Sequence, residues 1–135
     1  MMVTRVNPPG LATPSGFSHA VVTAVSEGSR VVFLAGQTGM DGTGAIVGGG
    51  LVPQFEQALG NLLAALAAAG GRPEQLTSLT VYIVDMDDYR SRAREIGAVW
   101  RRLAGRDYPA MAGVGVSRLW DAAALVEVQG CAVLP

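Results

Sequence analysis

Few side chains in this sequence are able to do covalent or acid–base chemistry. The 135 residues include one histidine and one cysteine, and all ten basic residues are arginines. Schiff-base catalysis through a lysine is therefore excluded. One histidine and one cysteine cannot form an ordinary zinc site, so we expect neither a metal nor a cofactor.

The single histidine and the single cysteine are interpreted as structural. His19 directly follows Ser18, but neighbours in sequence are no evidence for a Ser-His-Asp triad, whose members meet in space. Cys131 lies in a mostly apolar run and is expected to behave as a small buried hydrophobic residue. A lone cysteine also excludes an internal disulfide.

Glu127 is the carboxylate best placed for a chemical role, because the run 125–131 around it is mostly apolar. Strand alternation puts Glu127 on the face opposite Val126 and Val128. Two interpretations stay open. Glu127 is either a site carboxylate that moves protons in a pocket or a solvated group on a half-exposed sheet face.

Arginines gather in one segment, with six of the ten between Arg90 and Arg106. A stripe of this kind is able to contact phosphates, so RNA binding is an alternative interpretation. Acidic residues interleave with these arginines, and the net charge is −1. We therefore expect a solvated charged face, with neither nucleic acid nor a membrane as partner.

The first half of the sequence predicts two strands and a helix. Runs rich in β-branched residues at 20–26 and 30–36 flank a linker with Gly28, which is typical of a β-hairpin. A glycine-rich loop follows. From Leu51 to Ala69 apolar residues recur at helical spacing.

The second half predicts a strand at 76–84, a helix and two closing strands at 110–116 and 125–133. Aspartates at 85–88 open the helix, which suits the helix dipole. Its expected core stripe has helical spacing: Tyr89, Ala93, Ile96, Trp100 and Leu103.

The order β-β-α-β-α-β-β predicts one α+β domain over residues 1–135, with two helices on one face of a mixed sheet. Hydrophobic residues make up 50% of the chain and charged residues 16%. So much apolar surface predicts that a second subunit covers the other sheet face. The first nine residues lack a signal-peptide core, and we expect a soluble cytoplasmic protein.

Six local patterns, taken in order, resemble the Rid (YjgF-like) family over nearly the whole chain. Ser18-His19-Ala20-Val21 is similar to its Ser-His/Gln-Ala-Val, and Gln54, Gln57 and Asn61 follow its helix pattern Q-x-x-Q-x-x-x-N. The matching segments are 15–21, 33–37, 54–62, 84–89, 108–111 and 125–128.

The resemblance implies a chorismate-mutase-like fold and a homotrimer with pockets between subunits. It also implies hydrolysis of reactive enamines and imines to carbonyl compounds and ammonia, and some members are described as ribonucleases. In the hydrolysis an arginine holds the substrate carboxylate and a glutamate on the last strand activates water. Glu127 would be that glutamate.

The same resemblance implies a pocket lined by a short set of residues: Phe17, Ala35, Gly36, Met111 and Gly113. Met111 stands where the family has the arginine, Phe17 where it has tyrosine, and Ala35 where it has serine. A neutral or more apolar ligand suits such a pocket better than a small 2-imino acid. The residue types alone also allow Met111 and Phe17 to be simple core fillers.

The preferred hypothesis is an imine or enamine hydrolase that acts on a small metabolite in an intersubunit pocket. One alternative is a non-catalytic trimer that binds a small apolar molecule. The third is RNA contact through the arginine-rich helix.

Overall fold

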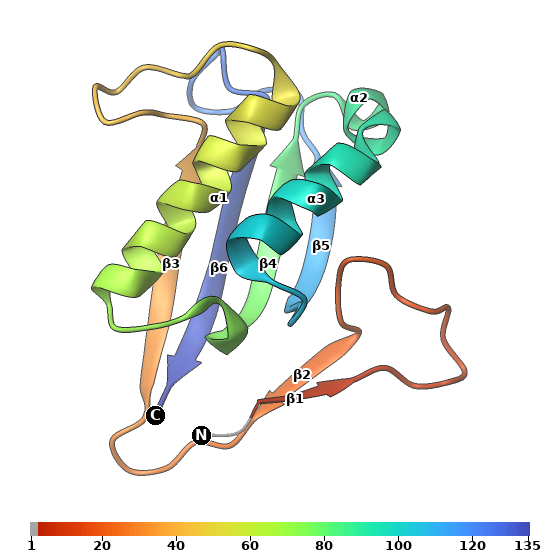
Figure 1. Cartoon of the computed structure of the whole chain (residues 1–135), viewed down its shortest axis with the longest axis vertical. Helices are drawn as coiled ribbons and strands as arrows, with labels where there is room; N and C mark the ends of the chain where they lie inside the picture. The colour runs from red at the N-terminus through yellow and green to blue at the C-terminus, as the bar shows by residue number, and fades with distance from the viewer. Residues whose placement is uncertain (1–2) are drawn as a thin grey trace.

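The computed structural model describes residues 3–135, which form a mixed four-stranded sheet with helices on one side (Figure 1). The sheet order is β3-β6-β4-β5, and a separate two-stranded sheet pairs β1 with β2. The strands are β1 (Val3–Val6), β2 (Ala20–Thr23), β3 (Arg30–Thr38), β4 (Leu76–Ile83), β5 (Ala110–Gly115) and β6 (Val126–Leu134). The helices are α1 (Leu51–Ala68), α2 (Met86–Ser91) and α3 (Ala93–Ala104), with a 3₁₀ turn at Pro73–Gln75.

The last strand occupies a central position in the sheet. β6 pairs antiparallel with β3 on one side and with β4 on the other, while β4 and β5 run parallel. Parallel neighbours need a crossover connection, and α2 and α3 supply it between β4 and β5. This arrangement is the predicted α+β sandwich, and the predicted fold class is confirmed.

Helix α1 begins and ends at glycines. Gly49 and Gly50 precede it with φ of 96° and 88°, and Gly70 follows it with φ of 91°. These left-handed conformations strain any residue with a Cβ, so glycine sets both ends of the helix.

The second predicted helix is two helices in the structure. Arg92 has φ of −104° and ψ of 19°, and it separates α2 from α3. Asp85 caps α2, since its carboxylate accepts a hydrogen bond from the Asp88 N–H at 3.0 Å. The predicted stripe is correct at Ile96 and Trp100, which are buried.

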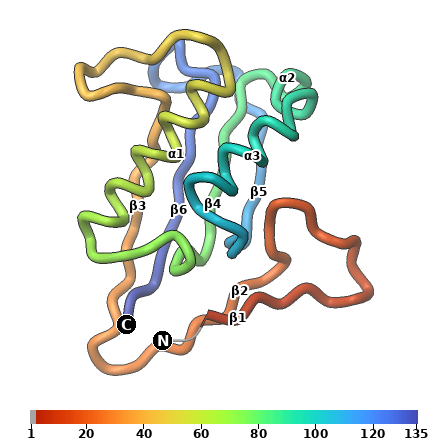
Figure 2. The backbone as a smooth tube through the Cα atoms, in the orientation of Figure 1, coloured from red at the N-terminus to blue at the C-terminus, as the bar shows by residue number. Residues whose placement is uncertain are grey.

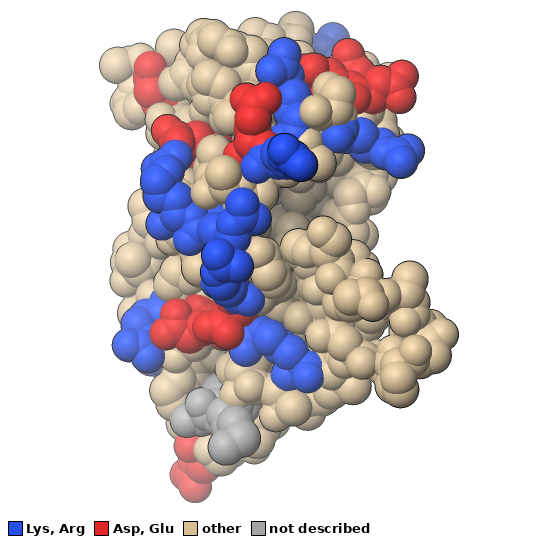
Figure 3. Space-filling model, turned by 45° about the vertical axis from the view of Figure 1, so that its right-hand side comes forward, with Lys and Arg blue, Asp and Glu red and all other residues tan. Residues whose placement is uncertain are grey.

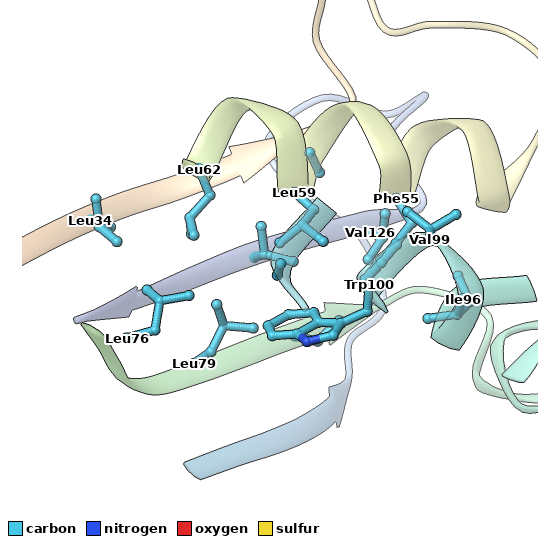
Figure 4. Close-up of a cluster of buried hydrophobic side chains, with 14 of the residues drawn as sticks. Leu34, Phe55, Leu59, Leu62, Leu76, Leu79, Ile96, Val99, Trp100 and Val126 are labelled. Atoms are coloured by element: carbon cyan, nitrogen blue, oxygen red, sulfur yellow. The ribbon is translucent and has the colours of Figure 1, made fainter. Parts of the chain in front are cut away.

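The core lies between α1, α3 and the sheet (Figure 4). Phe55 and Leu59 from α1 and Trp100 from α3 meet Leu79 and Val126 from the sheet. All five are at most 5% exposed. Burial of this apolar surface is the main term that holds the helices on the sheet.

The opposite face of the sheet has no helix against it (Figure 1). Phe33 and Val31 of β3 are 80% and 53% exposed on this face, opposite Cys131 and Val133 of β6. We call this surface the open face. The charge-poor composition predicts such a surface, because the apolar excess is not all inside the protomer.

The predicted hairpin of residues 20–26 and 30–36 is wrong. β2 pairs with β1, a strand that the sequence pattern did not indicate, and β3 pairs with β6 instead. Figure 2 shows the chain of β1 and β2 lying across the end of the main sheet. Arg5 of β1 fixes this two-stranded sheet to the rest of the protomer, because its guanidinium donates hydrogen bonds to the carbonyls of Tyr108 at 3.2 Å and Glu74 at 2.9 Å.

Candidate functional site

Glu127 lies on the open face, as strand alternation predicts. Its neighbours Val126 and Val128 are fully buried under the helices, so its own side chain points the other way. Across the strands it pairs with Thr38 of β3 and Tyr82 of β4.

A bulge in β3 brings the backbone close to Glu127. Leu34 pairs with Gly130 and Gln37 pairs with Val128, so two residues of β3 oppose one residue of β6 between these pairs. The two extra residues are Ala35 and Gly36, both exposed.

Gly36 lies against the end of the Glu127 side chain. A Cβ at position 36 would overlap the carboxylate in its present position, so this flexible side chain would have to move. The φ of Gly36 is not in the left-handed region, so its backbone conformation does not require glycine. The carboxylate of Glu127 therefore lies directly against the backbone of Gly36 in the β3 bulge.

The Glu127 carboxylate makes no hydrogen bond or ion pair with any residue from 3 to 135 in the protomer. On the same face the Tyr82 hydroxyl donates a hydrogen bond to Gln129 Oε1 at 3.2 Å. A half-buried carboxylate with free lone pairs is able to accept a proton from water.

A cleft of about 420 Å³ lies on the other side of the sheet, between α3, β5 and the N-terminal segment. Its size fits a small-molecule site. The residues that line it are Ser15, Gly16, Phe55, Tyr89, Ala93, Arg94, Ile96, Gly97, Trp100, Arg101, Tyr108 and Met111. We call it the α3 cleft.

Two aromatic pairs form much of its wall. Phe55 and Tyr89 meet edge to face with ring centroids 6.3 Å apart, and Trp100 stacks on Tyr108 at 6.1 Å. Burial raises the pKa of Tyr89 to about 12, so its phenol is neutral at physiological pH.

The N-terminal segment reaches the cleft through a short pairing with β5. Ser18 forms a parallel bridge with Ala110, its N–H donates to the Pro109 carbonyl at 2.9 Å, and its hydroxyl donates to the Tyr108 carbonyl at 2.7 Å. Phe17 is the preceding residue and stacks edge to face on His19 at 5.1 Å.

The predicted site residues fall into two groups within one protomer. Ala35 and Gly36 lie beside Glu127 on the open face. Met111 and Gly113 pair with the core residues Leu79 and Val81, so they face the helices. Strand β4 separates the groups, and one protomer does not bring Met111 to Glu127.

Sequence reasoning missed several residues around both groups. Tyr82 and Thr38 flank Glu127 through strand register, which no local pattern reveals. Tyr89, Trp100 and Tyr108 line the cleft, although two of them already stood out as core positions of a helix. Their aromatic type was the available signal.

The described residues contain neither a metal-binding cluster nor a membrane-spanning helix. Over residues 3–135, no three His, Cys, Asp or Glu side chains are placed to hold a metal ion. None of the helices in this described part of the chain combines the length and apolarity needed to cross a bilayer.

The sequence profile described as Endoribonuclease L-PSP matches residues 11–134 of this chain. The chain belongs to the L-PSP endoribonuclease family. Among relatives in this family, a RutC family protein of Pyrococcus horikoshii is 36% identical over 102 residues, which cover 75% of this chain and 77% of the relative. A goat protein named 2-iminobutanoate/2-iminopropanoate deaminase is 31% identical over 118 residues, or 87% of this chain and 79% of the relative.

Solved structures of the L-PSP endoribonuclease family share the fold. A Rid-family protein from Yersinia pestis superposes with a TM-score of 0.84 at 32% identity, covering 99% of this chain and 100% of that one. TdcF of Escherichia coli, whose structure contains bound serine, has a TM-score of 0.70 at 25% identity and covers 100% and 99%. The Rid resemblance expected from the sequence is confirmed.

Proposed function

We propose that this protein hydrolyses a C=N bond of a small metabolite in a pocket between subunits, with Glu127 as the residue that activates water. The observation that carries the proposal is the geometry of Glu127: a carboxylate without a protein partner, seated against the backbone of Gly36 on the open face. Relatives named as iminobutanoate deaminases support the class of reaction.

A second subunit completes the site in this proposal. The open face carries exposed Phe33 and Val31 near the carboxylate, and apolar surface of this kind is covered in stable assemblies. Within one protomer Glu127 and Met111 lie on opposite faces, so a neighbouring copy in a homotrimer would bring Met111, Gly113 and Phe17 to Glu127.

The chemistry balances with water alone. Glu127 accepts a proton from water as the water oxygen bonds to the imine carbon, and it returns this proton to the nitrogen to give a carbinolamine. Glu127 then accepts the proton of the carbinolamine hydroxyl and passes it to the nitrogen as the C–N bond breaks, so that ammonia leaves and a carbonyl compound remains. In this proposal the backbone of the β3 bulge, which lies beside Glu127, contacts the polar end of the substrate.

Met111 directs the choice of substrate. It offers neither a charge nor a donor where the resembled family has an arginine, and an Arg–carboxylate contact contributes roughly 2–5 kcal/mol. We expect 2-iminopropanoate to be a poor substrate, and more apolar imines to be better ones. TdcF, with its bound serine, shows that a fold neighbour accepts small polar molecules, which makes 2-iminopropanoate the right reference.

The test is ammonia release from a panel of imines generated in situ, with native protein, Glu127→Gln and Gly36→Ala. Glu127→Gln keeps the side-chain shape and is expected to lower turnover about 10²- to 10⁴-fold. Gly36→Ala pushes the carboxylate aside and is expected to lower it as well. Gly42→Ala is the matched control, since a Cβ there meets nothing within 4 Å.

Turnover by Glu127→Gln equal to that of the native protein would overturn the role of Glu127. Ligand-induced stabilisation without turnover of any imine would favour the non-catalytic binding trimer instead.

RNA binding is the second candidate, favoured by the name of the family profile and by the arginines over α3 (Figure 3). Against this candidate, some of these arginines form ion pairs with acidic residues of the same chain, which lowers the positive charge available to phosphates. Arg92 pairs with Asp88 at 2.9 Å and with Glu95 at 3.6 Å, and Arg102 pairs with Glu56. RNA affinity that falls steeply with salt would support this candidate.

A further inference from the structure

Two arginines of α3, Arg94 and Arg101, line the α3 cleft. Arg94, Gly97 and Arg101 follow one another at helical spacing of three and four residues, and all three line the cleft. Figure 3 shows the arginine side chains gathered beside the hollow of this face.

These two guanidinium groups have no acidic partner among residues 3–135. Arg92 and Arg102 on the same stretch form ion pairs with Asp88, Glu95 and Glu56, whereas Arg94 and Arg101 form none. Positive charge without a local counter-charge at the mouth of an enclosed space favours an anion there.

The wall of the cleft offers one polar group without a partner. The Tyr89 hydroxyl, on a ring that is neutral at physiological pH, makes no hydrogen bond with the described residues. The Trp100 indole nitrogen also has no acceptor within the described chain, but it is buried from solvent, so Trp100 contributes its ring surface to the cleft. A wall of aromatic rings with a single polar group is typical of a small-molecule site.

Gly97 keeps the space between the two arginines open. Glycine inside a helix costs about 0.5–1 kcal/mol relative to alanine. A Cβ at position 97 would lie 3.0 Å from Arg101 Nη1, so even alanine would require this guanidinium to shift slightly, and a larger side chain would occupy the space beside it.

We propose that the α3 cleft binds a small molecule with an aromatic or apolar body and a terminal carboxylate, with Arg94 and Arg101 neutralising the carboxylate and Tyr89, Trp100 and Met111 contacting the body. The charged end lies at exposed arginines and the body reaches Met111 on β5, so the ligand is larger than a 2-imino acid. The inference shares Met111 with the proposed function, but it concerns binding and needs no turnover.

The chain supplies its own reporter for the test. Trp100 lines the cleft, and the other of the two tryptophans is Trp120, which is 93% exposed. In a Trp120→Phe background, emission at 295 nm excitation comes from Trp100 alone. The probes are phenylacetate and 4-phenylbutyrate, with phenylacetamide as the uncharged match and phenyl phosphate as the other anion.

Both carboxylates are expected to change Trp100 emission saturably, with 4-phenylbutyrate the tighter and phenylacetamide about tenfold or more weaker than phenylacetate. Arg94→Gln and Arg101→Gln are each expected to weaken binding about 5- to 20-fold, since both groups are exposed and partly screened. Arg90→Gln removes the same charge outside the cleft and is the control.

Gly97→Leu gives a variant that keeps every charge. Its side chain fills the space between the arginines and is expected to abolish binding, while circular dichroism reports an intact helix.

Four results would overturn the site: no response to about 10 mM phenylacetate, equal affinity for phenylacetamide, unchanged affinity in both arginine variants, or preference for phenyl phosphate. Failure of the proposed function is distinguishable, because that function is tested by imine turnover in Glu127→Gln, whereas this site is tested by phenylacetate binding to Arg94→Gln and Arg101→Gln with no imine present. If the native protein hydrolyses imines but the α3 cleft binds no phenylacetate, the proposed function stands and the binding site proposed here is wrong.

Discussion

The two faces of the main sheet are built from alternate residues of the same strands, yet only one is closed within the protomer. On the helix face, Val126, Val128 and Leu79 are at most 2% exposed. On the open face, Phe33 is 80% exposed and Val31 is 53% exposed. Both faces carry apolar side chains, although the open face also carries Glu127, Gln129 and Tyr82.

The difference lies in what covers each face. Two amphipathic helices of the same chain, α1 and α3, cover the helix face and bury its apolar side chains. Among residues 3–135, the open face carries the Glu127 carboxylate without a hydrogen-bond partner, and no helix covers this face (Figure 1). Stability of the protomer is therefore expected to depend on the helix face, and assembly and chemistry on the open face.

The largest expected effect comes from the helix face. Leu62→Ala removes a fully buried side chain that α1 packs against the sheet. We expect the free energy of unfolding to fall by about 2–5 kcal/mol, since a cavity remains. Urea-induced unfolding measures it. Leu11→Ala, at a leucine that is 52% exposed, is the matched control and is expected to change stability by less than about 0.5 kcal/mol.

Phe33→Asp tests the open face next. A charge at the centre of an apolar interface is expected to weaken self-association about 100-fold or more, with the fold retained. Sedimentation equilibrium measures it, and Val25→Asp, at an exposed valine outside the sheet, is the control. Native protein that stays monomeric at micromolar concentration would contradict the homotrimer.

Cys131 gives an independent readout of the same prediction. It pairs with Phe33 on the open face. We expect its thiol to react slowly with a soluble disulfide reagent in the native assembly and faster in Phe33→Asp. Equal rates in both proteins would mean that Cys131 is not covered by assembly.

The smallest expected effect comes from Tyr82→Phe, which removes the hydrogen bond to Gln129 on the open face. Water replaces this partner at an exposed site, so we expect the free energy of unfolding of the protomer to change by less than about 0.5 kcal/mol. A loss above about 1 kcal/mol in urea unfolding would show that the two faces differ less than proposed.

Much of the fold could be predicted because its signals are local. The apolar period from Leu51 predicts α1, and alternation from residue 125 predicts β6 and the direction of Glu127. The hairpin prediction failed for the opposite reason. β-branched runs specify a strand but not its partner, and β2 pairs with β1 and β3 with β6 through contacts distant in sequence.

The sequence by itself determined α1, β4, β5 and β6, the exclusion of lysine chemistry, and Glu127 as the carboxylate in an apolar strand, because these follow from residue types and short periods. It did not indicate β1 or the break at Arg92 between α2 and α3. Only the tertiary structure decided that Glu127 faces Gly36 through a bulge, that Met111 lies on the other side of the sheet, and that Arg94 and Arg101 line a cleft with it. Those are statements about which strand lies beside which and which face a helix covers, and strand order depends on the free energy of the whole packed core.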